Sequence, residues 1–208
     1  LIFGNLHTSS NYNDEEDRYT SGRNGMGVKL TNVFSDYFYV EAYDPEKKMV
    51  YRQKWTDHMR TKGKYKLKDH DKGGGYTYVK WKPDFSLFKC EMYSPEVLSV
   101  FYKYVYDTAM ISGVDVYLNG RKIPIKSLTD YVKFYDVGDE KVNLDTRTCD
   151  VIVTPSKSGQ FEHVAFTNGV YNKDGGIHVQ MWSDAIFKPV LQKIRALKNA
   201  SFITIKDV

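Results

Sequence analysis

The chain has 208 residues, enough for one large domain or two small ones. Hydrophobic residues make up 41% and charged residues 27%, which is typical of a globular protein. The net charge is only +4, so it permits contact with nucleic acid without requiring it. No apolar run reaches the length of a membrane span, and no charged start followed by an apolar stretch indicates secretion.

A polar, acidic loop at residues 12–21 precedes a glycine-rich stretch, Gly22-Arg23-Asn24-Gly25-Met26-Gly27-Val28-Lys29. Glycines let a ligand approach the backbone, and N–H groups at the start of the helix-like run 30–35 can form an anion-binding nest. Lys29 can reach a phosphate, and Arg23 can form a forked contact with one. The pattern indicates polyphosphate binding. A surface loop with scattered basic residues is the alternative, because neither the P-loop nor the dinucleotide fingerprint is matched.

Further along the chain, alternation between residues 35 and 55 around a central turn predicts an antiparallel strand pair. The Lys-rich stretch 62–72 is interpreted as a solvated strand and turn, with nucleic-acid contact as the alternative. Ser94 as N-cap and Pro95 at the first helical position predict a helix, and Gly113 supplies its end.

Apolar residues that alternate on both sides of Asn119-Gly120 predict a β-hairpin. Polar residues at 135–143 interrupt the apolar pattern and indicate a domain boundary. Two strands are predicted after this boundary, at 149–154 and 161–167.

A long helix is predicted after Gly175-Gly176, followed by a strand at 201–208. We expect the apolar stripe of this helix to be core. The stripe consists of Val179, Trp182, Ile186, Val190, Ile194 and Leu197.

The two cysteines, Cys90 and Cys149, lack the spacing of a zinc site or a disulfide framework, so we expect buried, reduced thiols. The histidines are not clustered, and no spacing supports a Ser-His-Asp arrangement. The sequence therefore predicts no metal-ligating and no catalytic residue in this chain.

Several ordered stretches resemble one family. Residues 1–12 (LIFGNLHTSSNY) and 22–35, with an acidic linker between them, are similar to the ATP lid of eukaryotic-type type II DNA topoisomerases. Arg23-Asn24 stands where bacterial gyrases carry Leu-His, which favours the eukaryotic and large-virus branch. Three more stretches resemble the family's PDxxxF strand, VFLNGxKLP hairpin and GGxHV helix start: residues 76–85, 116–124 and 175–179.

The resemblance implies an α+β fold with two parts. Residues 1–136 would be the C-terminal part of a GHKL-type ATPase α/β sandwich, and residues 137–208 the start of a transducer domain with a ribosomal protein S5-like βαβ fold. The implied parent is a homodimeric, ATP-dependent topoisomerase that acts on double-stranded DNA in the nucleus, or in the host cytoplasm if it is viral. ATP and Mg²⁺ are the implied cofactors, with the metal ligand outside this chain.

The resemblance also assigns nucleotide contact to two groups of residues. One is the base of the lid, Ser9, Ser10 and Asn11, and the other is the loop Gly22, Arg23, Asn24, Gly25, Met26, Gly27, Val28 and Lys29. Hydroxyl, amide and backbone N–H groups would donate to ribose and phosphate oxygens, and Lys29 would offset phosphate charge. An ion pair of Arg23 with the acidic residues 14–17 is the alternative.

Four positions depart from the family pattern, namely Ser21, Met26, Val28 and Ile177. Val28 adds bulk beside the phosphate loop. His178, at the predicted helix start, is interpreted as a capping or packing residue. The late cations of this helix, Lys193, Arg195 and Lys198, are candidates for DNA contact, with a solvated helix end as the alternative.

In the family, the general base Glu and the Asn that holds magnesium precede the lid. The Gln-Thr-Lys loop and the DNA-cleaving Tyr follow the region that this chain resembles. We therefore expect a fragment that binds nucleotide weakly at most and does not hydrolyse ATP alone. Another GHKL ATPase, or a degenerate lid and transducer module without turnover, remains the alternative.

Overall fold

A computed structural model describes residues 1–13, 15–16, 20–71, 73–197 and 203. These form two compact units, Leu1–Leu98 and Ser99–Val208, and the division falls within helix α2 (Pro95–Ser112). The mixture of helices and antiparallel sheets confirms the α+β class. The predicted domain boundary after residue 136 stays a prediction. Among the described residues, no helix is long and apolar enough to cross a membrane.

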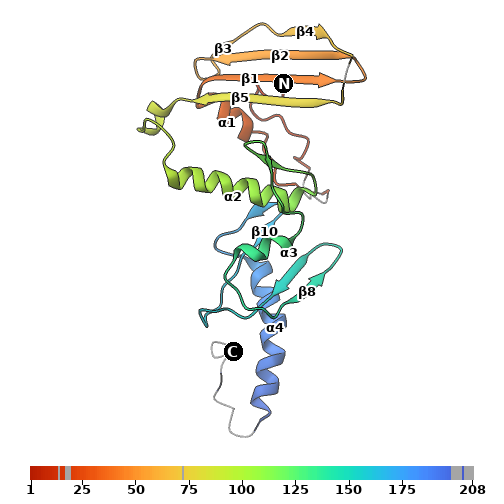
Figure 1. Ribbon diagram of the computed structural model, residues 1–208, viewed down its shortest axis with the longest axis vertical. Coiled ribbons are helices and arrows are strands. Elements are labelled where there is room, and N and C mark those ends of the chain that lie inside the picture. The colour runs from red at the N-terminus through yellow and green to blue at the C-terminus, as the bar shows by residue number, and fades with distance from the viewer. Residues whose placement is uncertain (14, 17–19, 72, 198–202, 204–208) are drawn as a thin grey trace. The chain divides into compact units, whose positions relative to one another are not determined.

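The first unit is an antiparallel sheet with a short helix, α1 (Gly27–Val33), against one face (Figure 1). The strand pair predicted between residues 35 and 55 is confirmed, and the Lys-rich stretch 62–72 forms part of two short exposed strands. The strands are β3 (Thr61–Lys62), β2 (Met49–Thr56), β1 (Ser35–Asp44) and β5 (Tyr76–Pro83) in spatial order, with β4 (Lys66–Asp69) also paired to β2.

Strand alternation separates an apolar face of this sheet from a polar one. The apolar face holds three buried residues, Phe38, Val40 and Trp55. Val28 of α1 and Phe3 of the N-terminal segment pack against them. Because burying one such side chain stabilises the fold by roughly 1.5–3 kcal/mol, this core fixes α1, and with it the glycine loop, to the sheet.

On the polar face, Glu41 is the centre of a hydrogen-bond cluster. Its Oε2 accepts from Tyr39 Oη at 2.8 Å and from Arg52 Nε at 2.6 Å, and its Oε1 accepts from Tyr76 Oη at 2.5 Å. These hydrogen bonds, the one from Arg52 first, lower the pKa of Glu41 from 4.5 to about 2. The carboxylate is therefore better stabilised in the folded state than in the unfolded chain.

We expect this cluster to make the free energy of unfolding depend on pH. The lowered pKa of Glu41 adds to the free energy of unfolding. This added stability is fully present above pH 4.5 and is lost as the pH falls towards 2. Glu41→Gln should cost about 1–2 kcal/mol at pH 7 and flatten the dependence below pH 4.5. Urea unfolding of both proteins at pH 7, 4 and 3 measures this. Parallel pH profiles for variant and wild type would contradict the assignment.

The second unit begins with most of helix α2. The predicted start is confirmed, since Ser94 Oγ accepts from the backbone N–H of Val97 at 3.4 Å. Gly113 follows the last helical residue with a φ of +67°, as expected for a helix end. The predicted hairpin at Asn119-Gly120 is also confirmed, and both turn residues have positive φ. Its strands are β6 (Tyr117–Leu118) and β7 (Arg121–Lys122).

The core of this unit contains a buried polar contact. Ala109, Ile123 and Ile125 surround Tyr131, at the end of helix α3 (Leu128–Tyr131). The Tyr131 hydroxyl donates to Asp107 of α2, which is only 5% exposed. Burial and this hydrogen bond raise the pKa of Tyr131 well above its usual range. A satisfied pair of this kind holds α3 against α2 in one arrangement.

The strand predicted at 149–154 is confirmed as β9 (Asp150–Val153), the strand predicted at 161–167 needs correction, and a further strand, at Val142–Asp145, was missed. The segment 161–167 is a strand only at β10 (Phe166–Thr167), which pairs with β11 (Val170–Tyr171). Strand β9 (Asp150–Val153) pairs with β8 (Val142–Asp145), which starts within the stretch predicted to be a boundary. Val142 is 62% exposed and Leu144 42%, so β8 lacks the buried alternation on which a sequence prediction depends.

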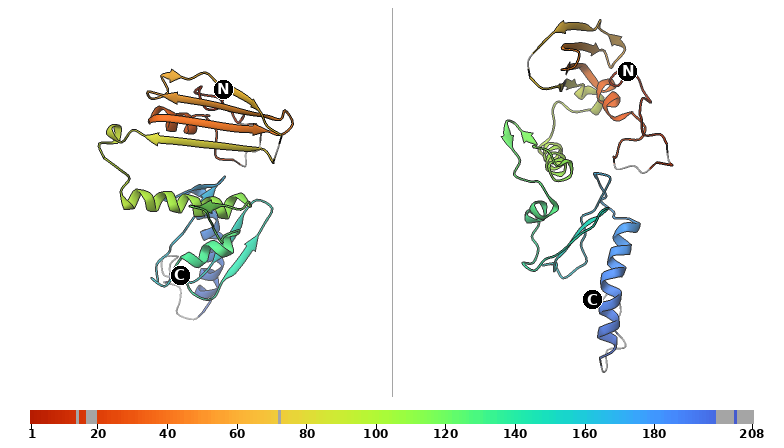
Figure 2. Two further views of the ribbon diagram at one scale, coloured as in Figure 1. Left: turned by 45° about the horizontal axis from the view of Figure 1, so that its top comes forward. Right: turned by 90° about the vertical axis from the view of Figure 1, so that its right-hand side faces the viewer.

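The long helix α4 (Ile177–Arg195) follows Gly175-Gly176 as predicted (Figure 2). Its stripe is less buried than expected, because Val190 is 40% and Leu197 66% exposed, whereas Leu191 beside the stripe is buried. In the predicted strand at 201–208, only residue 203 is described, so that strand stays a prediction.

Both cysteines are free thiols, but the expected burial is wrong, because neither side chain is fully buried. Cys90 is exposed and Cys149 is half-buried. Cys90 follows a short surface 3₁₀ helix, η1 (Phe85–Phe88), which places it outside the apolar core.

Candidate nucleotide-binding site

The structure brings the two predicted groups of nucleotide-binding residues together within the first unit. Asn11 Nδ2 donates to the carbonyl of Gly22 at 2.6 Å and to Thr20 Oγ1 at 3.1 Å. The Tyr12 hydroxyl donates to the carbonyl of Asn24 at 3.0 Å. The base of the lid and the glycine loop are therefore one hydrogen-bonded structure, although they are about ten residues apart in the sequence.

Gly25 packs closely against the backbone of Thr8, the residue before the base of the lid. Its φ is +59°, and a Cβ atom there would lie 2.1 Å from the carbonyl oxygen of Thr8. Only glycine fits both the left-handed backbone and the contact. Gly22 and Gly27 have nothing within 4 Å of a Cβ position, so their backbone is open to a ligand.

Lys29 is the most buried residue of the loop, with only 2% of its surface exposed. Its Nζ donates to the carbonyl of Thr8 at 3.1 Å, and no carboxylate forms an ion pair with it among the described residues. An ammonium group has three N–H donors, so two remain for another acceptor. A buried cation without a paired anion is costly, which favours an anionic ligand at this place. The sequence did not predict the burial or the contact with Thr8.

Helix α1 begins at Gly27 and ends at Val33, earlier than the helix-like run expected at 30–35, so the last three residues of the glycine stretch lie in its first turn. Helix α1 has only seven residues, and its N-cap, Met26, makes no side-chain capping bond. The side chain of Val28 packs into the sheet core, so the bulk expected beside the loop points elsewhere. Anion binding by this stretch would therefore rest on its backbone N–H groups and on Lys29.

The remaining predicted residues surround this core of the site. Ser9 Oγ accepts from the backbone N–H of Asn11 at 3.1 Å, and Ser10 Oγ contacts Asn11 Oδ1 at 3.4 Å. Arg23 and Asn24 are exposed. Of the acidic residues 14–17, which are the alternative partners of Arg23, Asp14 and Asp17 lie outside the described residues, so this alternative stays open. A side chain missed by the sequence is Asn32, whose Nδ2 donates to the carbonyl of Phe3 at 3.1 Å and joins α1 to the N-terminal segment.

In the second unit, Lys193 and Arg195 are exposed in the last turn of α4. Arg195 Nε donates to the carbonyl of Ile203 at 2.8 Å, and Lys198 lies outside the described residues. His178 does not cap the helix: the N-cap is Gly176, and the buried Nε2 of His178 has no partner in the described part of the chain. The capping role expected for His178 is therefore wrong, and the packing role stays a prediction.

Comparisons with known proteins show which proteins this chain resembles. No protein-family model matches the chain. The DNA topoisomerase 2 of invertebrate iridescent virus 6 is 36% identical over 214 residues, 100% of this chain. The solved ATPase region of Saccharomyces cerevisiae topoisomerase II superposes with a TM-score of 0.87 at 33% identity, over 96% of this chain.

The chain is similar to part of the ATPase and transducer region of type II DNA topoisomerases. The DNA topoisomerase 2 of Bombyx mori is 37% identical over 99% of the chain, and the ATPase and transducer domains of the Balamuthia mandrillaris enzyme superpose with a TM-score of 0.84 at 34% identity over 94% of it. The chain spans only 18% of the viral relative's length and 14% of the silkworm relative's. It covers 54% of the solved yeast region and 51% of the Balamuthia one. The topoisomerase resemblance of the lid, hairpin and helix start is thereby confirmed.

Proposed function

We propose that this chain is part of the ATP-operated gate of a type II DNA topoisomerase, which passes one duplex through a transient break in another. One observation carries the proposal: the ammonium of Lys29 is buried at the base of an open glycine loop and forms no ion pair with a carboxylate among the described residues. Nucleotide binding would close the lid and join two copies as a homodimer. The enzyme would act in the nucleus, or in the host cytoplasm if the source is viral.

The donors of the site fit phosphate rather than metal. Residues 9–11 and 22–29 contain hydroxyl, amide, guanidinium, ammonium and backbone N–H groups, and no carboxylate. These groups would bind the triphosphate and hold it in place, with Lys29 at the inner end of the loop. Magnesium, when bound with ATP, neutralises phosphate charge, and its protein ligand would lie outside these residues.

A duplex DNA partner is supported by the polar face of the sheet. Cross-strand register places six cations on this face, together with the tyrosines around Glu41. They are Arg52, Lys54, Lys66, Lys68, Lys80 and Lys82. Among the described residues, only Arg52 and Lys82 are paired with carboxylates, Glu41 and Asp36. Unpaired cations on an exposed sheet suit a phosphate backbone.

We expect the triple variant Lys66→Ala/Lys68→Ala/Lys80→Ala to weaken duplex binding by the chain independently of sequence. The slope of log affinity against log salt should fall by roughly 0.9 for each cation that contacts a phosphate. Fluorescence anisotropy with a short labelled duplex at several salt concentrations measures this. The matched control is Lys126→Ala/Lys133→Ala/Lys188→Ala, which removes three cations that already pair with carboxylates.

Lys193→Ala/Arg195→Ala tests the late cations of α4 in the same assay. If only this variant changed the salt slope, the DNA contact would lie on α4 and not on the sheet. Equal salt slopes for all the variants and the wild type would contradict DNA contact by either the sheet or α4.

Decatenation and ATP turnover assays of the full-length parent distinguish the remaining candidate functions. ATP-dependent decatenation of linked DNA circles supports the topoisomerase. ATP turnover without strand passage would favour another GHKL ATPase, and the absence of both activities would favour a degenerate module. The isolated chain should hydrolyse no ATP.

A further inference from the structure

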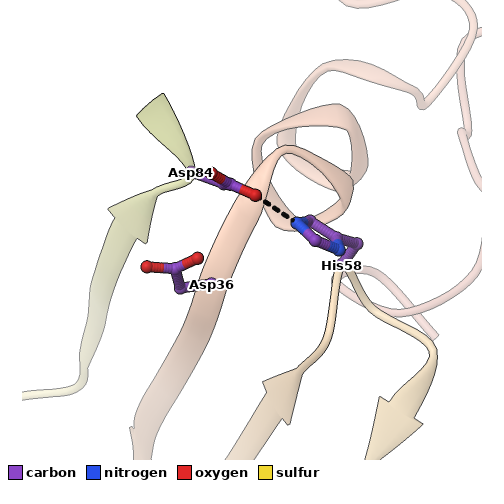
Figure 3. A group of neighbouring side chains, drawn as sticks. All are labelled: Asp36, His58 and Asp84. Atoms are coloured by element: carbon purple, nitrogen blue, oxygen red, sulfur yellow. Dashed lines mark hydrogen bonds and ion pairs between the residues drawn. The ribbon is translucent and has the colours of Figure 1, made fainter. Parts of the chain in front are cut away.

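One imidazole and two carboxylates meet in the first unit, away from the residues proposed to bind nucleotide (Figure 3). Asp36 lies in β1, His58 in the turn between β2 and β3, and Asp84 directly after β5. One ligand atom from each residue lies within 4.8 Å of the other two. Three segments that are distant in the sequence thus supply a mixed nitrogen and oxygen donor set, which suits zinc.

The backbone holds each of these side chains in place. The register between β1 and β5 shifts around Asp36, as in a β-bulge, and bulges re-aim side chains. His58 lies in a turn where Asp57, His58 and Met59 all have positive φ, and Met59 is anchored against the sheet core. Asp84 caps η1, because its Oδ1 accepts from the backbone N–H of Ser86 at 2.9 Å.

The present contacts show how a cation would fit. His58 Nε2 lies 2.8 Å from Asp84 Oδ2, so the imidazole already faces a carboxylate. Lys82 Nζ lies 2.6 Å from Asp36 Oδ2 and supplies the positive charge at this place. The three side chains are 41%, 26% and 17% exposed for Asp36, His58 and Asp84, so a metal ion could enter from solvent.

We propose that Asp36, His58 and Asp84 form a zinc site that joins the β2–β3 turn to β1 and β5. Zinc takes ligands at about 2.0–2.2 Å in a tetrahedron, commonly three from protein and one water, which sets ligand atoms about 3.3 Å apart. The three ligand atoms, which lie within 4.8 Å of one another, would move closer together through rotation of the exposed Asp36 side chain. An imidazole ligand favours zinc over magnesium, which prefers oxygen ligands in an octahedron.

Zinc binding would change the partners of His58 and Lys82. Zinc takes the lone pair of His58 Nε2, so the ring proton resides on Nδ1, which lies 3.6 Å from Asp57 Oδ1. Asp57 would thereby orient the metal-bound imidazole. Lys82 gives up Asp36 and turns to solvent. Lys82 therefore competes with the metal, and its removal should strengthen binding. If the three side chains formed only hydrogen bonds and ion pairs with one another, removal of Lys82 would not strengthen zinc binding.

The experiment is titration calorimetry of the full chain with ZnCl₂, with the unfolding temperature measured with and without zinc. Both cysteines are changed to Ser in every protein so that thiolates bind no metal. We expect one zinc per chain and a higher unfolding temperature. His58→Gln, which keeps an N–H donor towards Asp84, and Asp36→Asn should each weaken binding about tenfold or more. Lys82→Ala should strengthen it severalfold, and MgCl₂ should give no heat.

Circular dichroism of each variant confirms that it is folded. The proposal is overturned if zinc does not bind, if His58→Gln or Asp36→Asn binds zinc as tightly as the wild type, or if Lys82→Ala binds it more weakly. None of these results bears on the nucleotide site, because the two sites share no residue.

Discussion

Gly25→Ala in the full-length parent protein is expected to abolish detectable ATP binding. A methyl group at this position would lie 2.1 Å from the carbonyl oxygen of Thr8, and the backbone φ of +59° is unfavourable for alanine. The left-handed conformation alone costs roughly 1–2 kcal/mol. The clash is with backbone, so it can be relieved only by separating the glycine loop from the base of the lid. Calorimetric titration with a non-hydrolysable ATP analogue measures the affinity.

Gly74→Ala is the matched control for this prediction. It makes the same chemical change outside the proposed nucleotide site, at a position where nothing lies within 4 Å of the new methyl group. We expect a folded protein with nearly unchanged affinity for the analogue. If Gly25→Ala bound ATP as the wild type does, the close packing of the loop against Thr8 would not matter for nucleotide binding.

Lys29→Met is the second substitution with a large expected effect. Methionine fills similar space without charge, so the loss of a charge-assisted contact to phosphate should cost about 2–3 kcal/mol, or roughly 30- to 150-fold in ATP affinity. Because Lys29 is buried without an ion pair among the described residues, the nucleotide-free protein should keep its stability or gain some. ATP should therefore raise the unfolding temperature of the wild type but not that of the variant.

A purely structural lysine would behave differently. If the only role of Lys29 were its hydrogen bond to Thr8, Lys29→Met would unfold more easily without nucleotide and would still bind ATP when folded. Lys64→Met, at an exposed position between β3 and β4, controls for the loss of one positive charge. It should leave both ATP affinity and stability unchanged.

Much of the fold could be predicted because local signals agreed with the tertiary structure. Ser94-Pro95 and Asn119-Gly120 fix backbone conformations over a few residues, whatever lies around them. The alternation across 35–55 matches a sheet with one buried and one solvated face. The structure also joins the two segments proposed from the sequence to bind nucleotide, residues 9–11 and 22–29, through Asn11, while their contact with nucleotide stays a prediction.

The errors share a physical cause, which is dependence on contacts that a local pattern does not contain. Strand β8 exposes both Val142 and Leu144, so its pairing with β9 leaves no periodic signal. The buried Leu191 beside the predicted stripe of α4 reflects what that helix packs against. The buried Lys29 donates its Nζ hydrogen bond to the carbonyl of Thr8, which is 21 residues away in the sequence. Likewise, histidines unclustered in the sequence gave no hint that the fold gathers His58 with Asp36 and Asp84.

Decatenation of linked DNA circles by the full-length parent, wild type beside Lys29→Met, tests the central claim most directly. The account predicts ATP-dependent decatenation by the wild type and almost none by the variant at the same ATP concentration, with both proteins folded. Decatenation by Lys29→Met at the wild-type rate would contradict the phosphate role of Lys29, and a wild type without strand passage would contradict the proposed topoisomerase.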